Sequence, residues 1–385
     1  MASPTPINRR QMLGTISGSL IAGSTFSTVS GFEGITERIP MTIHNGEVLE
    51  WKEVPREWNR HRKRSRLAVE KVKRKHAANE WVQSITRTST DESIGQLQKF
   101  ELIIRTENQE KANNEIPDQY HGIPIRFDQP KKFDADTGQD SSSTQSSCWW
   151  EGDDCVPGGS HIKPEKEDTT TNCTSTSLVE IDGDPYMMSA AHCFTDINCR
   201  FEPYPNIFGH EMSLHTEDRI GDVEYYSMYQ DWAVAPLAND AEVDGLDNSI
   251  EDESRQVIGS TSQSGVDALV ASSETVYKRG IATCIQSGEV EAVDSWNYCD
   301  TFPYSDFVIL SAERAVGDSG GPYYRYFTFN NQPYISILGL HYGRADARTV
   351  TNYPDDWAGG TAAYEIVDSM SDVGLSFGSL NNYCS

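Results

Sequence analysis

Three short stretches of this chain hold the side chains that nucleophilic catalysis needs. Residues 317–322 read Gly-Asp-Ser-Gly-Gly-Pro, residues 189–193 read Ser-Ala-Ala-His-Cys, and Asp231 stands before Trp-Ala-Val. A serine hydroxyl is a poor nucleophile near neutral pH and needs a base to take its proton. A histidine serves as that base when a buried carboxylate fixes its tautomer and stabilises the imidazolium. The sequence therefore predicts Ser319 as nucleophile, His192 as base and Asp231 as the orienting acid.

In the order His, Asp, Ser, these motifs resemble those of the chymotrypsin-like (trypsin-fold) serine proteases of secreted haloarchaeal or bacterial type. The serine motif is matched at all six positions, and Ser189 departs mildly from the usual Thr-Ala-Ala-His-Cys. One glycine-rich motif could mark a tight turn by chance, but three motifs in this order argue against that interpretation. The resemblance implies an all-β fold of two antiparallel six-stranded β-barrels with a short C-terminal helix. His192 and Asp231 would come from the first barrel and Ser319 from the second.

Strand-like runs separated by turn residues predict the elements that position these groups. A hairpin is expected to deliver His192 at its end, two short strands to bracket Asp231, and a second hairpin to follow Ser319. The runs are residues 177–181 with 186–189, 223–226 with 232–234, and 323–329 with 334–340, and a helix is expected over 362–370.

The glycines around Ser319 suit an oxyanion hole, because backbone N–H groups must converge there and glycine tolerates the φ values that this demands. By resemblance, the N–H groups of Gly317 and Ser319 hold the oxyanion, and Asp318 forms a buried ion pair that shapes the loop. In animal members its partner is a new N-terminus cut before Ile-Val-Gly-Gly. Residues 155–159, Cys-Val-Pro-Gly-Gly, match that only loosely, so the partner of Asp318 stays open.

The eight cysteines all lie between Cys148 and Cys384. By resemblance, Cys173 pairs with Cys193 and Cys284 pairs with Cys299. The other four (Cys148, Cys155, Cys199 and Cys384) allow three pairings, and the sequence does not choose among them. No Cys-x-x-Cys pair occurs, so neither a metal site nor a cofactor is predicted.

Specificity is predicted from the stretch 338–343, Leu-Gly-Leu-His-Tyr-Gly. It resembles the Gly-Ile-His-Trp-Gly stretch of bacterial glutamate-specific proteases, where the histidine meets the substrate carboxylate. His341, Tyr342 and Gly343 are therefore candidate pocket residues, with Arg314 and Arg344 adding positive charge. Glu313 lies near the position where trypsin-type enzymes carry an acid that selects Lys or Arg. We favour an acidic P1 residue and leave open both a basic P1 residue and a purely structural His341.

Charge divides the 385 residues into two parts: residues 1–147 have a balance of +2, and residues 148–385 one of −28. The boundary between the two parts comes just after residues 141–147, a polar run that is typical of a flexible linker. We predict a twin-arginine-type signal peptide at 1–31, a pro-region at 32–147 and the protease domain at 148–385. Residues 8–13, Asn-Arg-Arg-Gln-Met-Leu, precede a short apolar stretch, which with the even cysteine set indicates folded export and secretion.

The acidic balance suits a salt-rich environment, because molar salt screens self-repulsion. An ordinary acidic secreted enzyme is the alternative. Such a surface argues against nucleic acid or membrane as a partner.

The pro-region is predicted to be α+β. Residues 55–76 are strongly basic, with apolar residues at helical intervals up to about Trp81, and residues 100–105 and 122–127 look like strands. The basic helix would be drawn to the acidic block, where the segment would act as intramolecular inhibitor or chaperone. A solvated basic face is the alternative.

The sequence thus predicts a serine endopeptidase that acts on protein or peptide substrates through an acyl-enzyme. A non-catalytic binding protein on a protease fold is the rival, although such proteins usually lose a triad residue. A serine esterase of the α/β-hydrolase type would place its triad in another chain order.

Salt should stabilise the full chain. Between 0.1 M and 3 M sodium chloride, we expect the thermal unfolding midpoint, followed by circular dichroism, to rise by roughly 5–10 °C as carboxylate repulsion is screened. Chloride is chosen over sulfate because sulfate also stabilises by exclusion from protein surfaces. A midpoint that stays constant or falls would contradict salt adaptation.

Overall fold

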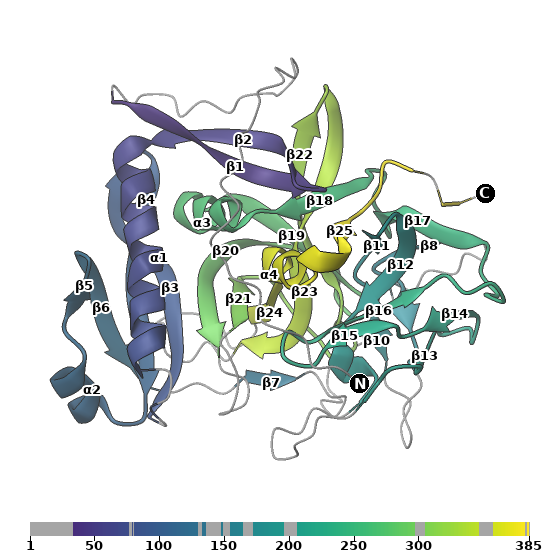
Figure 1. The fold of residues 1–385 in the computed structure, drawn as a ribbon, viewed down its shortest axis with the longest axis horizontal. Coiled ribbons are helices and arrows are strands. Elements are labelled where there is room, and N and C mark those ends of the chain that lie inside the picture. Colours follow the sequence, from purple (N-terminus) through teal and green to yellow (C-terminus); the bar gives the residue numbers. More distant parts are fainter. Residues whose placement is uncertain are drawn as a thin grey trace.

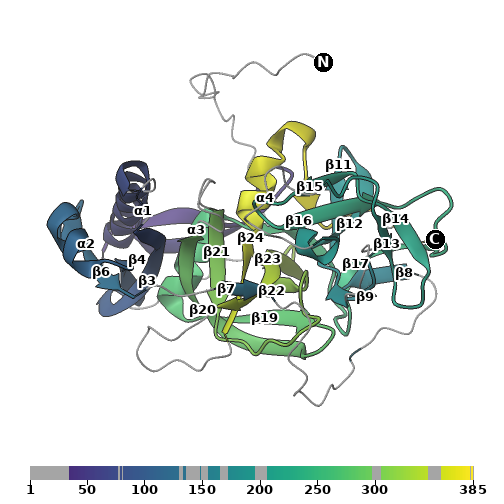
Figure 2. The same cartoon turned by 90° about the horizontal axis from the view of Figure 1, so that it is seen from below.

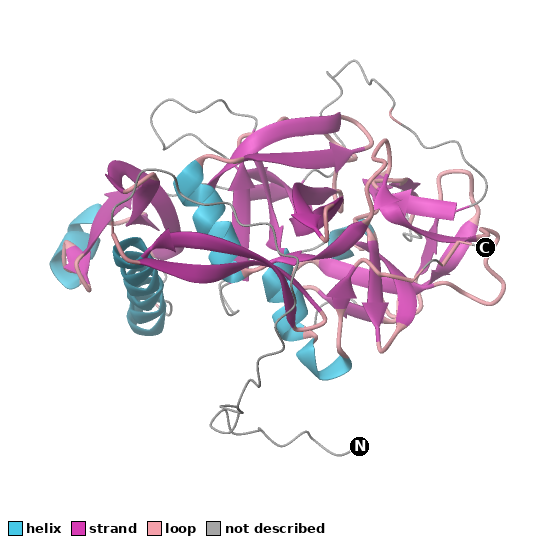
Figure 3. Ribbon diagram, turned by 90° about the horizontal axis from the view of Figure 1, so that it is seen from above, coloured by secondary structure: helices cyan, strands magenta, loops and turns pink. Residues whose placement is uncertain are grey.

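The structure is a computed structural model, and strands dominate it (Figure 3). The residues that it describes are 34–76, 79, 81–129, 133–135, 148, 155–164, 172–195, 206–296, 305–345, 357–381, 383 and 384. The predicted signal peptide at 1–31 and linker at 141–147 lie outside these residues. No helix among them is long and apolar enough to cross a membrane.

The C-terminal half of the protease block is a closed antiparallel barrel. Its ring runs β19-β20-β21-β24-β23-β22 and returns to β19, each strand pairing antiparallel with the next. Closure removes the unpaired edges of the sheet. Its strands are β19 (Thr275–Gly280), β20 (Cys284–Trp296), β21 (Ser305–Leu310), β22 (Pro322–Phe329), β23 (Gln332–Ala345) and β24 (Trp357–Ala362).

The other half is built on a five-stranded sheet in the order β15-β16-β12-β11-β25, with three two-stranded ladders beside it. Both halves contribute to one hydrophobic cluster, in which Val234 and Phe194 share a core with Tyr324 and Leu340. The strands are β8 (Cys155–Gly158), β9 (His161–Ile162), β10 (Cys173–Thr174), β11 (Leu178–Ile181), β12 (Asp184–Ser189), β13 (Glu211–Ser213), β14 (Arg219–Asp222), β15 (Tyr225–Ser227), β16 (Trp232–Pro236), β17 (Gly245–Ile250) and β25 (Ser376–Phe377). The predicted all-β, trypsin-like architecture is confirmed.

Two helices flank the barrels. Helix α3 (Gln263–Ser272) follows β18 (Val257–Thr261) in the connection between the halves, and Ser262 caps it by accepting from the N–H of Gly265. Helix α4 (Ala363–Ser369) confirms the predicted C-terminal helix. Short 3₁₀ turns η1 (Ala191–Cys193) and η2 (Ser371–Val373) complete this part.

The N-terminal segment is α+β, as predicted, and lies on the side of the C-terminal barrel away from the other half (Figure 1). Helix α1 ends at His76, short of the predicted limit near Trp81. A small core between α1 and its strands includes Val72, Ile85 and Ile104. The elements are β1 (Thr36–His44), β2 (Glu47–Pro55), α1 (Arg56–His76), β3 (Val82–Ile94), β4 (Leu97–Thr106), α2 (Gln109–Glu115), β5 (Gln119–Tyr120), β6 (Ile123–Asp128) and β7 (Phe133–Ala135).

Three strands of this segment join the sheet of the protease block. Strand β3 pairs with β20, β1 with β18, and β7 with β23, all antiparallel. The result is a 14-stranded sheet that continues from the barrel into the N-terminal segment (Figure 2). The two parts of the chain are therefore joined by backbone hydrogen bonds as well as by side chains.

Three disulfides are present among the described residues: Cys148–Cys284, Cys155–Cys384 and Cys173–Cys193. The expected Cys284–Cys299 pair is wrong, because Cys284 is bonded to Cys148. The backbone N–H of Cys148 donates to the carbonyl of Ile281 at 3.3 Å, and the Cα atoms of Cys148 and Cys284 lie 5.4 Å apart, within the range that a disulfide needs. A cysteine forms only one disulfide, so Cys284 cannot also bond to Cys299. Cys199 and Cys299 themselves lie outside the described residues.

Peptide mapping without reduction tests this pairing. Digestion of the alkylated protein should release a fragment that joins the peptides containing Cys148 and Cys284, and mass spectrometry identifies it. A fragment that joins Cys284 to Cys299 would restore the earlier pairing.

Candidate active site

His192 and Asp231 meet because β12 and β16 are antiparallel neighbours. Ser189, at the end of β12, pairs with Ala233 near the start of β16, so the turn after one strand lies beside the turn before the other. Asp231 Oδ2 lies 2.7 Å from His192 Nδ1, and Asp231 Oδ1 accepts from the backbone N–H of His192 at 2.8 Å. Asp231 also has a left-handed φ of 53°, which aspartate tolerates better than most residues. The acid thus fixes both the ring and the backbone of the histidine.

Ser319 lies in the turn before β22, and the other half of the protease block contacts this turn. The backbone N–H of Thr174 donates to the carbonyl of Ser319 at 2.7 Å, and Thr176 Oγ1 donates to the carbonyl of Gly320 at 2.6 Å. A Cβ on Gly320 would come within 2.2 Å of the Thr174 carbonyl, so only glycine fits there. Neither threonine was predicted from the sequence, although Thr174 directly follows Cys173.

The three predicted triad residues are buried, with exposed fractions of 4% for His192, 3% for Asp231 and 1% for Ser319. His192 Nε2 and Ser319 Oγ are both buried, and neither makes a hydrogen bond within the described part of the chain. Unpaired buried polar atoms are rare and require an explanation such as catalysis. Hydrogen bonds between catalytic groups are often long in a free enzyme and shorten when substrate binds.

The loop before Ser319 contains Gly317, whose N–H was predicted to hold an oxyanion together with that of Ser319. Gly317 has a φ of 102°, a left-handed value that favours glycine. Its carbonyl accepts from Thr174 Oγ1 at 2.7 Å. Within the described residues, the N–H groups of Gly317 and Ser319 donate to no protein acceptor.

Asp318 pairs with Lys278, a residue of β19, whereas the resemblance left its partner open. Both side chains are fully buried, and Lys278 Nζ lies 2.5 Å from Asp318 Oδ2. Thr283 donates to the same carboxylate through its N–H at 3.2 Å and its hydroxyl at 2.7 Å, and Ala282 N–H donates at 3.0 Å. Burial alone would raise the pKa of Asp318, but the Lys278 charge, together with smaller contributions that include the hydrogen bonds from Lys278 and Thr283, holds that pKa below its usual value. The loop is therefore held in shape without a cut in the chain.

Lys278 could have been suspected from the sequence. The block 148–385, with its balance of −28, contains only three lysines, namely Lys163, Lys166 and Lys278. Because lysine is so rare in this acidic block, a lysine within a strand suggests a buried carboxylate partner.

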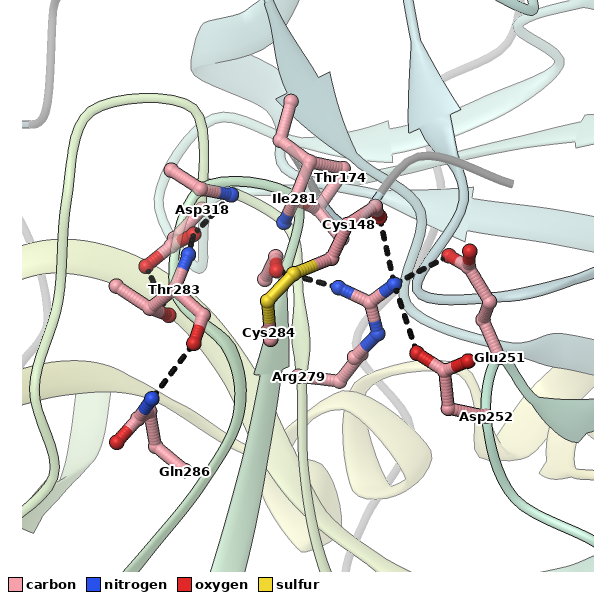
Figure 4. Close-up of a disulfide and its surroundings, with 12 residues drawn as sticks. Cys148, Thr174, Glu251, Asp252, Arg279, Ile281, Thr283, Cys284, Gln286 and Asp318 are labelled. Atoms are coloured by element: carbon pink, nitrogen blue, oxygen red, sulfur yellow. Dashed lines mark hydrogen bonds and ion pairs between the residues drawn. A yellow bond between two sulfur atoms is a disulfide. The ribbon is translucent and has the colours of Figure 1, made fainter. Parts of the chain in front are cut away.

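A second buried cation lies beside this loop, next to the Cys148–Cys284 disulfide (Figure 4). Arg279 is fully buried and donates to the carbonyl of Cys148 at 2.7 Å, and its guanidinium lies 2.6 Å from Glu251. Cys284 directly follows Thr283, one of the residues that hold Asp318. The start of the protease block is thereby fastened to the base of the oxyanion loop.

The candidate pocket residues lie on β23 and on the loop before Ser319. His341 is fully buried, with Nδ1 2.6 Å from the hydroxyl of Tyr323. The ring of Tyr342 packs edge-on against His192, with centroids 5.3 Å apart. Gly343 is buried, Glu313 is exposed and Arg314 is half-buried. Only the backbone carbonyl of Glu313 joins the site, by accepting from Lys278 at 3.1 Å.

Strand β7 of the N-terminal segment runs antiparallel along this same part of β23. Ala135 pairs with Gly343 and Phe133 pairs with Ala345. An extended chain from the N-terminal segment thus covers the strand that was predicted to line the specificity pocket. Within the described residues no group of three or more His, Cys, Asp or Glu could hold a metal ion.

Solved structures similar to this chain include a glutamic-acid-specific serine protease described as using a novel histidine triad in substrate binding, with 20% identity and a TM-score of 0.39. Thermobifida fusca protease A shows 16% identity with a TM-score of 0.37, and a Nocardiopsis protease 15% with 0.37. Each alignment covers 58% of this chain and at least 99% of the other. No protein-family model and no curated protein matches. Similarity this low leaves function to be judged from the geometry of the site.

Replacing Lys278 tests the ion pair. Lys278→Met leaves Asp318 buried and uncompensated, so we expect a loss of about 3–5 kcal/mol in the free energy of unfolding, measured by urea denaturation. Lys163→Met is the matched control, because that lysine is partly exposed and pairs with the exposed Glu217, and should cost less than about 1 kcal/mol. Equal losses in the two variants would show that the buried pair is dispensable.

Proposed function

We propose that this chain is a serine endopeptidase that hydrolyses peptide bonds through an acyl-enzyme. The observation that carries the proposal is the contact between Asp231 and His192, 2.7 Å at Nδ1 and 2.8 Å at the backbone N–H. A carboxylate so placed fixes the histidine tautomer and leaves Nε2 to act as the base.

In this mechanism His192 Nε2 takes the proton of Ser319 as the hydroxyl oxygen attacks the substrate carbonyl. The N–H groups of Gly317 and Ser319 stabilise the negative charge that develops on the carbonyl oxygen. His192 then donates its proton to the leaving amine, which leaves an acyl-enzyme on Ser319. In the second half of the reaction His192 takes a proton from water as the water oxygen attacks the acyl carbon, and it then returns that proton to the Ser319 oxygen as the acid product leaves. The Lys278–Asp318 pair keeps the donors in position throughout.

For specificity we propose an acidic P1 residue, recognised by His341 together with Tyr342, Gly343 and Arg314. A protonated imidazole is a suitable partner for a carboxylate. The Tyr323 hydroxyl, 2.6 Å from His341 Nδ1, fixes the orientation of the ring. The exposed side chain of Glu313 gives less support to the alternative of a basic P1 residue.

We further propose that the N-terminal segment keeps the enzyme silent. A peptide that adds as an antiparallel strand to an exposed edge is a common mode of binding, and β7 occupies β23 in that way. Substrate would need the same edge, so β7 must leave before substrate enters. Secretion by the twin-arginine route and adaptation to salt complete the proposal and rest on the sequence.

A non-catalytic binding protein on the same fold is the competing function. It would have no need for a complete triad, and it would bind peptides equally well after Ser319 is replaced.

Cleavage of a diverse peptide library, mapped by mass spectrometry at multimolar salt, tests both activity and specificity. We expect cuts after Glu or Asp, and Ser319→Ala should lower the rate by a factor of 10³ or more, since triad residues act as a unit. His341→Leu should remove the acidic preference while cleavage elsewhere persists. Cuts after Lys or Arg would indicate that Glu313 selects a basic P1 residue. Unchanged cleavage by Ser319→Ala would exclude the mechanism.

A further inference from the structure

The N-terminal segment and the C-terminal barrel share one hydrophobic core. Trp58 of α1 and Phe100 of β4 are fully buried in the same cluster as Val266 and Leu269 of α3 and Leu310 of β21. Figure 1 shows α3 between the N-terminal helix and the barrel. This arrangement resembles a single domain core, which is typical of permanent interfaces between subunits.

A buried carboxylate lies at the centre of this contact. Asp267 of α3 is fully buried and forms ion pairs with three arginines, all from the N-terminal segment. Its Oδ2 lies 3.1 Å from Arg62 Nη1 and 2.6 Å from Arg66 Nε, while Oδ1 accepts from Arg66 Nη2 at 2.8 Å and from Arg87. Burial alone would raise the pKa of Asp267, but the charges of Arg66, Arg87 and Arg62, together with the hydrogen bond from Arg66, outweigh it and lower that pKa. The carboxylate is therefore ionised and wholly dependent on the N-terminal segment.

Two further contacts join the same parts. Arg325 of β22, 5% exposed, pairs with Glu50 of β2. Lys73 of α1 lies 3.3 Å from Asp306 of β21. If the N-terminal segment left, Asp267, Arg325 and Asp306 would lose the ion pairs described here, and a hydrophobic surface around α3 would be exposed to water. A buried charge without its partner is strongly destabilising.

From these contacts we propose that residues 36–128 remain bound to the protease block after the linker is cut, as a permanent second subunit of the active protein. Only the stretch that carries β7 has to leave the site. That the two-piece protein is active rests on the proposed function, whereas the association of the two pieces does not. Because buried ion pairs are screened far less than exposed ones, the subunit stays bound in molar salt.

All eight cysteines lie in residues 148–385, so no disulfide can hold the two pieces together. A recognition sequence for a site-specific protease, inserted between Ser142 and Ser143 of the full chain, allows the linker to be cut at will. The experiment is done with Ser319 and with Ser319→Ala, and denaturing electrophoresis confirms the cut. Size-exclusion chromatography and native mass spectrometry at 0.1 M and 3 M sodium chloride should find both pieces in one species. Elution of a folded protease block without residues 36–128 would overturn the proposal.

Asp267→Asn tests the carboxylate that the three arginines surround. Removing its charge should weaken the affinity between the two pieces by about 100-fold, measured by dissociation on dilution. Asp240→Asn is the matched control, since that carboxylate is 82% exposed and pairs with Arg219 inside the protease block; it should leave the affinity unchanged. Equal affinities in the two variants would show that the arginine cluster does not hold the two pieces together. The elution of the unaltered protein would then decide whether the subunit stays bound.

The two proposals can fail separately. Peptidase activity that elutes with residues 143–385 alone would refute the permanent subunit and leave the protease intact. A stable two-piece species with no activity, equal to its Ser319→Ala counterpart, would refute the proposed function and leave the subunit.

Discussion

The ion pair between Lys278 and Asp318 is the interaction on which the site depends. It joins β19 of the C-terminal barrel to the loop before β22, and both side chains are fully buried. A buried pair is stable only when its remaining hydrogen bonds are made. Thr283, Ala282 and Ala315 supply those bonds to Asp318. Because Asp318 lies between Gly317 and Ser319, the pair positions the proposed oxyanion donors and the proposed nucleophile together. Lys278 belongs to the chain itself, so it can pair with Asp318 as the protein folds. Under the proposed function, activity would then be controlled by whether substrate can enter the site.

The two halves of the protease block then have to meet at this loop. Thr174 and Thr176 bind the backbone around Ser319, while Thr361 of β24 donates to the carbonyl of Gln230, the residue before Asp231, at 2.6 Å. Each half therefore holds the other's catalytic turn. The fit is tight enough that Gly320 has no room for a side chain.

The sequence predicted the parts of this protein whose signals are local. The hairpins near His192 and beyond Ser319 and helix α4 follow from alternation and turn residues, and the triad follows from short motifs. Helix α3 was missed among strand-like runs, although Ser262 is a typical N-cap. The bond between Cys148 and Cys284 was not predictable, and the scarcity of lysine in the acidic block could only have raised the suspicion that Lys278 has a buried partner, because each contact joins residues that only the folded sheet brings together. The sequence predicted that the basic helix would be attracted to the acidic block, but it did not predict the three arginines around Asp267. Net charge indicates that two parts attract each other and does not indicate which carboxylate is buried between them.

The disulfide between Cys155 and Cys384 spans 229 residues, and His192, Asp231 and Ser319 all lie within the loop that it closes. Between these two cysteines the backbone is in effect a ring. A single cut in any surface loop of a ring opens it without dividing it, so both new ends stay on one covalent molecule. A protein that works among proteolytic copies of itself could thus be nicked once and keep all three catalytic residues in the same piece.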